Sequence, residues 1–231
     1  TYRENDSLVH LALAETESYK YMFFDVAHII GDGITMNILM EDLKKIYDGE
    51  HVDKETFTFY EYILDHEADQ KAGGEQRDVA EVARLMEGNR LTRTALLRHD
   101  RQDCSKGVYN VIRRRLDRIV RKQILYYCKM NNVSENALFL AAFNYTLALF
   151  SNEDDVFVNS IHSGRTDGRF AGVAGCIFRT YLCRYQRVAH EKVNDLITKT
   201  GKQIMNTMKV RTSVSCMGAM FLQYQGDILS V

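Results

Sequence analysis

The sequence contains no proline, although average usage would place roughly ten prolines in a chain of this length. It also lacks an initiator methionine, since the first residue is Thr1, and it stops within an apolar run over residues 217–231. These features lead us to expect that the chain is a piece of a longer protein.

Three further absences restrict the classes of function. No apolar run approaches the length that spans a bilayer, and the first residues lack the pattern of a signal peptide, so we expect no membrane as partner. The 30 basic and 31 acidic side chains nearly cancel, which disfavours a nucleic acid as partner. The cysteines are odd in number and form no C-x-x-C pair, which favours reduced thiols and a cytoplasmic protein. They are Cys104, Cys128, Cys176, Cys183 and Cys216.

The hydrophobic content is sufficient for a substantial core. Apolar residues make up 45% of the 231 residues, which fits one large domain or two small ones. The stretch with the most chemical information, residues 27–33, places His28 four residues before Asp32, with a glycine on each side of that aspartate. The glycines indicate a tight loop, and histidine is the side chain best suited to move a proton near neutral pH.

Hydrophobic patterning predicts mixed strands and helices around this loop. An aromatic and β-branched run, residues 19–26, predicts a buried strand before the loop, and apolar spacing predicts a helix from the loop to Tyr47. The chain after Ser134 predicts a helix that is apolar nearly all round and therefore buried. Further helices are expected over residues 117–130 and 193–208, and within residues 60–101 with a break at 73–74. Further strands are expected over residues 108–116, 156–161, 176–185 and 213–224. Because strands and helices do not alternate strictly, the pattern favours a layered α/β sandwich.

Four segments stand in a recognisable order. They are His28-Ile29-Ile30-Gly31-Asp32-Gly33, then Phe59-Tyr60-Glu61-Tyr62, then Asp154 to Asn159 with the turn Gly164-Arg165, and then Gly175, Thr180 and Arg184. In this order they resemble the H-H-x-x-x-D-G signature, the Y-x-D-Y segment, the D-D-I-V-V-G strand with its G-R turn, and the I-G-x-F-V-N-T-L-x-L-R motif of condensation domains of non-ribosomal peptide synthetases. Ala27 stands at the first signature histidine, and Arg179 at the asparagine of the last motif.

The resemblance implies a fold and a function. The fold is an α/β two-layer sandwich of the chloramphenicol-acetyltransferase type, with part of the first lobe and most of the second lobe present. Residues 1–70 are expected to be the remainder of the N-terminal lobe, which carries the loop, and residues 71–231 an incomplete C-terminal lobe. The implied function is that of an acyltransferase, which forms an amide bond between a donor acyl thioester and an acceptor aminoacyl thioester on carrier proteins.

The same resemblance implies roles for the loop and its partners. His28 is expected to be catalytic, either as a general base or as electrostatic support for the zwitterionic intermediate. Asp32 can cap the following helix, and the resemblance implies instead a pair with an arginine. Arg165 is the first candidate for that pair and Arg184 the second. Both aspartate roles are structural.

Three further residues are expected near the site. Gly33 leaves room for the close approach of a substrate or a backbone. His162 and Thr180 are candidates to line the substrate channel, although a histidine at this place is more often simply part of a strand. No metal is expected, because the glycines argue against a helix that would align His28 with Asp32, and no third ligand has suitable spacing.

Cofactor and partners follow from the resemblance as well. No cofactor is expected to bind directly, since phosphopantetheine is carried by the partner carrier proteins. Adjoining synthetase domains are expected as further partners. A basic cluster is either a solvated helix face or a landing patch for an acidic carrier protein or its phosphopantetheine phosphate. Its members are Arg113, Arg114, Arg115, Arg118, Arg121 and Lys122.

Two alternative functions remain open. The first is a stand-alone acyltransferase of the same superfamily, which would transfer an acyl group from acyl-CoA to a free alcohol or amine. The second is a catalytically inactive docking module that keeps the fold.

Overall fold

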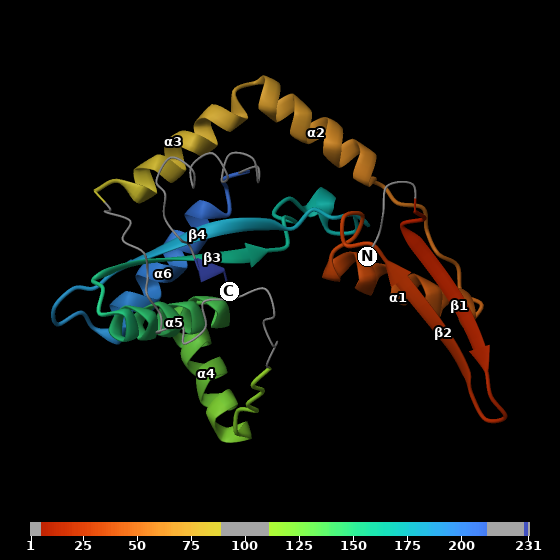
Figure 1. Ribbon diagram of the computed structural model, residues 1–231, viewed down its shortest axis with the longest axis horizontal. Coiled ribbons are helices and arrows are strands. Elements are labelled where there is room, and N and C mark those ends of the chain that lie inside the picture. Colours follow the sequence, from red (N-terminus) through yellow and green to blue (C-terminus); the bar gives the residue numbers. More distant parts are fainter. Residues whose placement is uncertain (1–5, 89–110, 212–228, 231) are drawn as a thin grey trace, which may run out of the picture. The chain divides into compact units, whose positions relative to one another are not determined.

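The computed structural model of this chain describes residues 6–88, 111–211 and 229–230 (Figure 1). The chain divides into two compact units, of which the first comprises residues 1–74 and 162–179, and the second residues 75–161 and 180–231. The expected segments 1–70 and 71–231 differ from these units chiefly because residues 162–179 belong to the first unit. Each unit is described by itself.

The first unit begins with an antiparallel hairpin. Strand β1 (Val9–Glu15) pairs with β2 (Lys20–Val26) along its whole length. Strand β2 confirms the strand expected over 19–26, whereas β1 was not predicted. The expected burial of β2 is wrong, because most side chains of both strands are exposed. The hairpin is a two-stranded sheet among the described residues, so neither strand pairs with a third strand there.

Helix α1 (Gly33–Tyr47) follows the loop and confirms the expected strand–loop–helix order. The Asp32 side chain caps its first turn by accepting a hydrogen bond from the backbone N–H of Thr35. Lys44 and Lys45 lie in the last turn, where positive charge is favoured by the helix dipole.

Helix α2 (Phe59–Lys71) is fixed by its first turn and by its apolar face. Thr58 and Glu61 form a capping box, in which each side chain accepts a hydrogen bond from the backbone N–H of the other residue. The core of the first unit consists of aromatic and branched side chains beside the short 3₁₀ helix η1 (Gly168–Phe170). Its buried members are Tyr62, Phe170, Val173 and Ile177, with Phe57 and Phe59 partly buried against them.

The second unit contains four helices and a small sheet within the part of the chain that the structure describes (Figure 1). The helices are α3 (Gly74–Met86), α4 (Arg118–Asn131), α5 (Glu135–Ser151) and α6 (Val193–Thr207), where Gly74 itself belongs to the first unit. The sheet has the order β4-β3-β5, from strands β3 (Asp155–His162), β4 (Arg179–Gln186) and β5 (Leu229–Ser230). Strands β3 and β5 run parallel.

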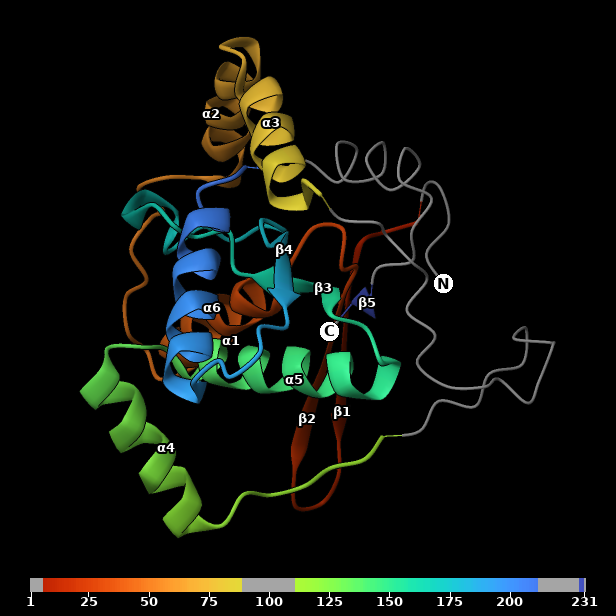
Figure 2. The same ribbon diagram turned by 90° about the vertical axis from the view of Figure 1, so that its left-hand side faces the viewer.

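Helix α5 occupies the centre of this unit. The Ser134 side chain caps it, as expected, and α5 packs against α6 (Figure 2). Its buried residues join strands β3 and β4 in one apolar cluster that includes Leu140, Val158, Tyr181 and Ile197. The expectation that the whole helix is buried is wrong, because Phe139, Phe143 and Phe150 are exposed.

Other expected elements have mixed outcomes. The break at Gly73-Gly74 is confirmed, since α2 ends at Lys71 and α3 begins at Gly74. The strand expected over 108–116 is wrong for residues 111–116, which form no regular element, and its first three residues lie outside the described part. The strand expected over 176–185 begins only at Arg179, because Cys176–Phe178 belong to the bonded loop described below. The strand expected over 213–224 lies outside the described residues.

Hydropathy and thiols complete the description. Within the described residues no single helix is long and apolar enough to cross a membrane, and α4 with α5 reach that threshold only as a pair bent by 105°. The cysteines described as free are Cys128, Cys176 and Cys183. The cytoplasmic location stays a prediction.

Candidate functional site

The loop between β2 and α1 presents His28 to solvent. The backbone N–H of Ile30 donates to the carbonyl oxygen of Ala27 at 3.0 Å, which closes a turn around the histidine. The imidazole ring contacts the edge of the Phe178 ring, with 5.6 Å between the centroids. Among the described residues, no hydrogen bond involves the His28 side chain, which leaves both ring nitrogens available to a substrate.

Asp32 is the buried anchor of the same loop. Its Oδ1 accepts hydrogen bonds from the backbone N–H and the hydroxyl of Thr35, at 2.9 and 3.0 Å. Its Oδ2 accepts from the backbone N–H of Ile177 at 3.2 Å and from Nη1 of Arg165 at 2.8 Å. The two roles weighed for Asp32, helix cap and partner of an arginine, are therefore both present in one carboxylate.

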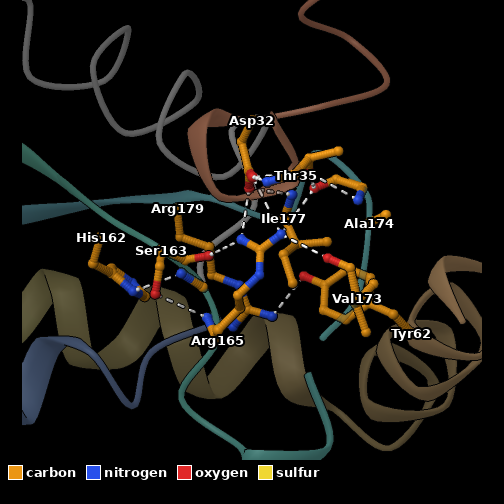
Figure 3. A network of polar contacts seen from close by, with 12 residues as sticks. Asp32, Thr35, Tyr62, His162, Ser163, Arg165, Val173, Ala174, Ile177 and Arg179 are labelled. Carbon is orange, nitrogen blue, oxygen red and sulfur yellow. Dashed lines mark hydrogen bonds and ion pairs between the residues drawn. The ribbon is translucent and has the colours of Figure 1, made fainter. Parts of the chain in front are cut away.

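Arg165 joins this loop to a segment more than 130 residues away (Figure 3). Its guanidinium binds both carboxylate oxygens of Asp32, and it also donates to the carbonyl oxygens of Ser163, Val173 and Gly175. Both side chains of the ion pair are almost completely buried, at 4% and 5% exposure. The predicted choice of Arg165 as the partner of Asp32 is confirmed.

The charge of Asp32 is stabilised by these contacts. Burial raises the pKa of its carboxyl, but the hydrogen bonds from Arg165 and Thr35 and the positive charge of Arg165 lower it to about 2. Asp32 is therefore ionised at neutral pH and cannot exchange a proton there. Within the loop, that leaves His28 as the side chain suited to proton transfer.

The turn that carries Arg165 requires a glycine. Gly164 has a φ of +71°, and a Cβ at this position would collide with the carbonyl oxygen of Ile177. The backbone N–H of Gly164 donates to Nδ1 of His162 at 3.1 Å. The turn thus lies directly against the segment that binds Asp32.

His162 is a buried member of this turn. Burial and the nearby positive charge of Arg179 lower the pKa of His162 to about 4, so its ring is neutral at physiological pH. Its Nδ1 is the acceptor for Gly164, which fixes the tautomer with the proton on Nε2. The role as a channel-lining residue stays a prediction, and so does that of Thr180, a half-buried residue of β4.

Arg184 is not a partner of Asp32, which makes the second candidate for that pair wrong. Its guanidinium binds Asp155 in the second unit, with Nη2 to Oδ2 at 2.6 Å, and donates to the carbonyl oxygens of Leu85 and Glu87. It therefore ties the end of α3 to strands β3 and β4.

Gly33 has open space around it. A Cβ at this position would meet no atom within 4 Å in the described part of the chain, and its φ lies outside the left-handed region. Neither packing nor backbone conformation of this chain explains the glycine. The expectation that it leaves room for a substrate stays a prediction.

The sequence reasoning missed two contributors to the network. The single hydroxyl hydrogen of Thr35 is shared between Oδ1 of Asp32 at 3.0 Å and the carbonyl oxygen of Gly175 at 2.8 Å, and the hydroxyl oxygen accepts from the N–H of Gly175 at 3.0 Å. Its position three residues after a capping aspartate was the available signal. Arg179 is buried and donates to the Tyr62 hydroxyl at 2.9 Å, a contact that no local pattern indicates.

Family and sequence comparisons agree with one another. The sequence model of a family described as "Condensation domain" matches residues 2–212. Among curated proteins, surfactin synthase subunit 1 of Bacillus subtilis (strain 168) is 23% identical over 200 residues, which cover 86% of this chain and 6% of that protein.

Solved structures share the fold. The condensation domain of the Monacolin K polyketide synthase MokA has a TM-score of 0.74 at 16% identity, covering 96% of this chain and 52% of that chain. The epimerization domain from the third module of tyrocidine synthetase B has a TM-score of 0.66 at 18% identity, covering 94% of this chain and 52% of that one. These likenesses confirm the expected sandwich of the chloramphenicol-acetyltransferase type. The chain spans about half the length of these solved domains.

Proposed function

We propose a function on one premise: this chain belongs to the condensation domain family. Members of this family in non-ribosomal peptide synthetases are amide-forming acyltransferases. The chain is proposed to be the part of such an enzyme that carries its reactive histidine. Its reaction joins a donor acyl thioester to the amine of an acceptor aminoacyl thioester, and the donor's thiol is the leaving group.

One observation carries this proposal: His28 is exposed, its side chain makes no hydrogen bond within the described residues, and it lies on a loop whose other end is held by a buried ion pair. Asp32 and Arg165 hold the loop without competing for the proton, since the carboxylate is ionised and fully bonded. The reaction joins two separate substrates, so placing them correctly beside His28 supplies much of the rate.

His28 acts on the amine of the acceptor. The ring nitrogen that carries no hydrogen can accept a proton from the attacking amine, or the ring can stabilise the charge that develops as the tetrahedral intermediate forms. The proton returns to the leaving thiol when the thioester carbon–sulfur bond breaks. Phosphopantetheine, which belongs to the partner carrier proteins, supplies the thiol and the reach of its arm.

The test is His28→Ala in the intact enzyme, with Ile29→Ala as the matched control. Ile29 is the adjacent loop residue and is 76% exposed, so its truncation changes the same loop without touching the imidazole. We expect condensation to fall at least 100-fold in His28→Ala, within the range of general acid–base contributions, with an unchanged unfolding midpoint. Undiminished amide formation from two loaded carriers would contradict the role of His28.

The assay must identify the product as well as the rate. A solved epimerization domain shares this fold, so the fold alone does not select amide formation. Mass analysis distinguishes a new amide from an unchanged thioester, and chiral analysis detects inversion of the aminoacyl group. Acyl transfer from free acyl-CoA to a small amine, without carriers, would favour the stand-alone acyltransferase instead.

A further inference from the structure

The N-terminal part of α4 and the residues before it carry an unusual concentration of positive charge. Between residues 113 and 122 there are six basic side chains and one acidic side chain, Asp117. The carboxylate of Asp117 caps α4 by accepting from the backbone N–H of Ile119 at 2.7 Å. The six basic residues are exposed.

None of these six basic side chains forms an ion pair with a carboxylate among the described residues. Cations elsewhere do so: Lys44 pairs with Asp48, and Arg84 pairs with Glu81. An exposed cation without a partner is ordinarily just solvated. Six of one sign within ten residues, however, create a field that attracts an anionic partner.

The positions of these basic residues do not stabilise helix α4. Arg118, Arg121 and Lys122 lie in the first two turns of α4, and the first turn contains no acidic residue. The N-terminus of a helix is the positive end of its dipole, where cations are disfavoured. Helix stability therefore does not account for these residues, and their charge adds to that of the helix end.

The helical spacing gathers them on one face. Arg118, Lys122, Leu125 and Lys129 follow one another at intervals of three or four residues, and Arg121 lies three residues after Arg118 and four before Leu125. We call these five residues the basic face of α4. Leu125 lies in its middle and is 42% exposed. Single exposed apolar side chains are ordinary on protein surfaces, and arginine is the residue of this face that is enriched where proteins bind one another.

The opposite face of α4 borders a groove. Val120, Ile124 and Tyr127 line a groove of about 1170 Å³ toward α5 and α6. The Tyr127 hydroxyl donates to Oδ1 of Asn194, at 2.7 Å, at the start of α6. Since these residues lie on the other side of the helix, the basic face is directed away from this groove.

We propose that the basic face of α4 docks an acidic surface of the protein domain that carries the thioester substrate. This inference rests on the proposed function, which requires such a domain to approach the enzyme repeatedly. Carboxylates on the partner would face the cations of the basic face, and an apolar side chain would meet Leu125. Opposite charge accelerates encounter, and its effect weakens as salt screens it.

The test compares two double variants of the intact enzyme. Arg121→Glu with Lys122→Glu removes the net positive charge of the basic face, and Lys199→Glu with Lys202→Glu makes the same change of charge at exposed positions of α6. Condensation is measured with carrier-bound substrates and with the same acyl groups on free pantetheine. We expect the first variant to raise KM for the carrier-bound substrate at least 10-fold, and to leave kcat/KM for the free thioesters within 2-fold. The α6 variant should change neither.

Other outcomes separate this proposal from the proposed function. If the unmodified enzyme makes no amide, the proposed function fails, and docking is measured directly as the Kd of the carrier domain at low and high salt. A basic-face variant that binds the carrier as tightly as the α6 variant overturns the docking proposal. Loss of binding to duplex RNA or phosphatidylserine vesicles, with carrier binding retained, overturns it as well.

Discussion

Each unit contains an arginine–aspartate ion pair whose arginine is almost completely buried, and the two pairs differ in what they hold. In the first unit Arg165 binds Asp32, and both side chains are about 95% buried. In the second unit Arg184 binds Asp155, whose side chain is 26% exposed. Each arginine also donates to backbone carbonyl oxygens, so the two guanidinium groups have similar chemical surroundings.

The difference lies in the carboxylate. Asp32 belongs to the loop that presents His28, and it caps α1 at the same time. Asp155 is the first residue of β3, and with Arg184 it fixes the end of α3 to the sheet. The same ion pair therefore supports a reactive loop in one unit and only the packing of elements in the other. This difference can be tested by removing each carboxylate in turn.

The largest effect is expected for Asp32→Ala. The substitution leaves the Arg165 guanidinium buried without its counter-ion and removes the cap of α1, so we expect a loss of about 3–5 kcal/mol in the free energy of unfolding. Activity should fall as well, because the loop that holds His28 loses its anchor. Denaturant unfolding and the condensation rate per folded molecule measure the two effects. If Asp32→Ala kept full activity, the pair would be no more than a structural tie.

The turn beside Arg165 can be tested by measuring the free energy of unfolding as the pH is lowered. The folded-state pKa of His162 is about 4, below its ordinary value of 6.5. Between these two pH values the unfolded chain binds a proton at His162 and the native chain does not. The contribution of the neutral His162 ring to the free energy of unfolding is fully present above pH 6.5. It is lost as the pH falls toward 4, by up to about 3 kcal/mol. Below that range, protonation of Asp32, whose folded pKa is about 2 against 3.8, continues the loss.

His162→Asn is the control for this titration. Asparagine can keep an acceptor for the backbone N–H of Gly164 but has no titratable ring. The stability of this variant, measured by urea unfolding between pH 4 and 6.5, should depend less steeply on pH than that of the unmodified chain. An identical slope for both proteins would rule out His162 as the cause.

The smallest effect is expected for Asp155→Ala. Because Asp155 is partly exposed, water can hydrate the Arg184 guanidinium when the carboxylate is removed. Arg184 also keeps its two carbonyl acceptors. We expect a loss of about 1–2 kcal/mol in the free energy of unfolding. The condensation rate per folded molecule should stay within 2-fold, because no described contact of Asp155 reaches the His28 loop. A loss of activity as large as that of Asp32→Ala would erase the distinction between the two pairs.

Local patterns were sufficient for most of the helices. The spacing of apolar residues together with caps such as Ser134 predicted α1, α5 and α6 close to their observed bounds. These signals are local, since a cap and an amphipathic face are set by residues within a few positions of one another. The strand β1 was missed, and the burial of β2 and of all sides of α5 was overestimated. Whether a face is covered depends on other elements, which no short window contains.

The sequence by itself determined that His28 would lie on a loop between a strand and a helix, and that Asp32 would be placed to cap that helix. Only the tertiary structure decided which of two arginines pairs with Asp32. Arg165 and Arg184 lie 133 and 152 positions after Asp32 in the sequence. The guanidinium groups of both arginines donate to backbone carbonyl oxygens. The choice is made by the bend at Gly164 and by the backbone around Ile177, because a buried ion pair is favourable only where the surrounding geometry satisfies both partners.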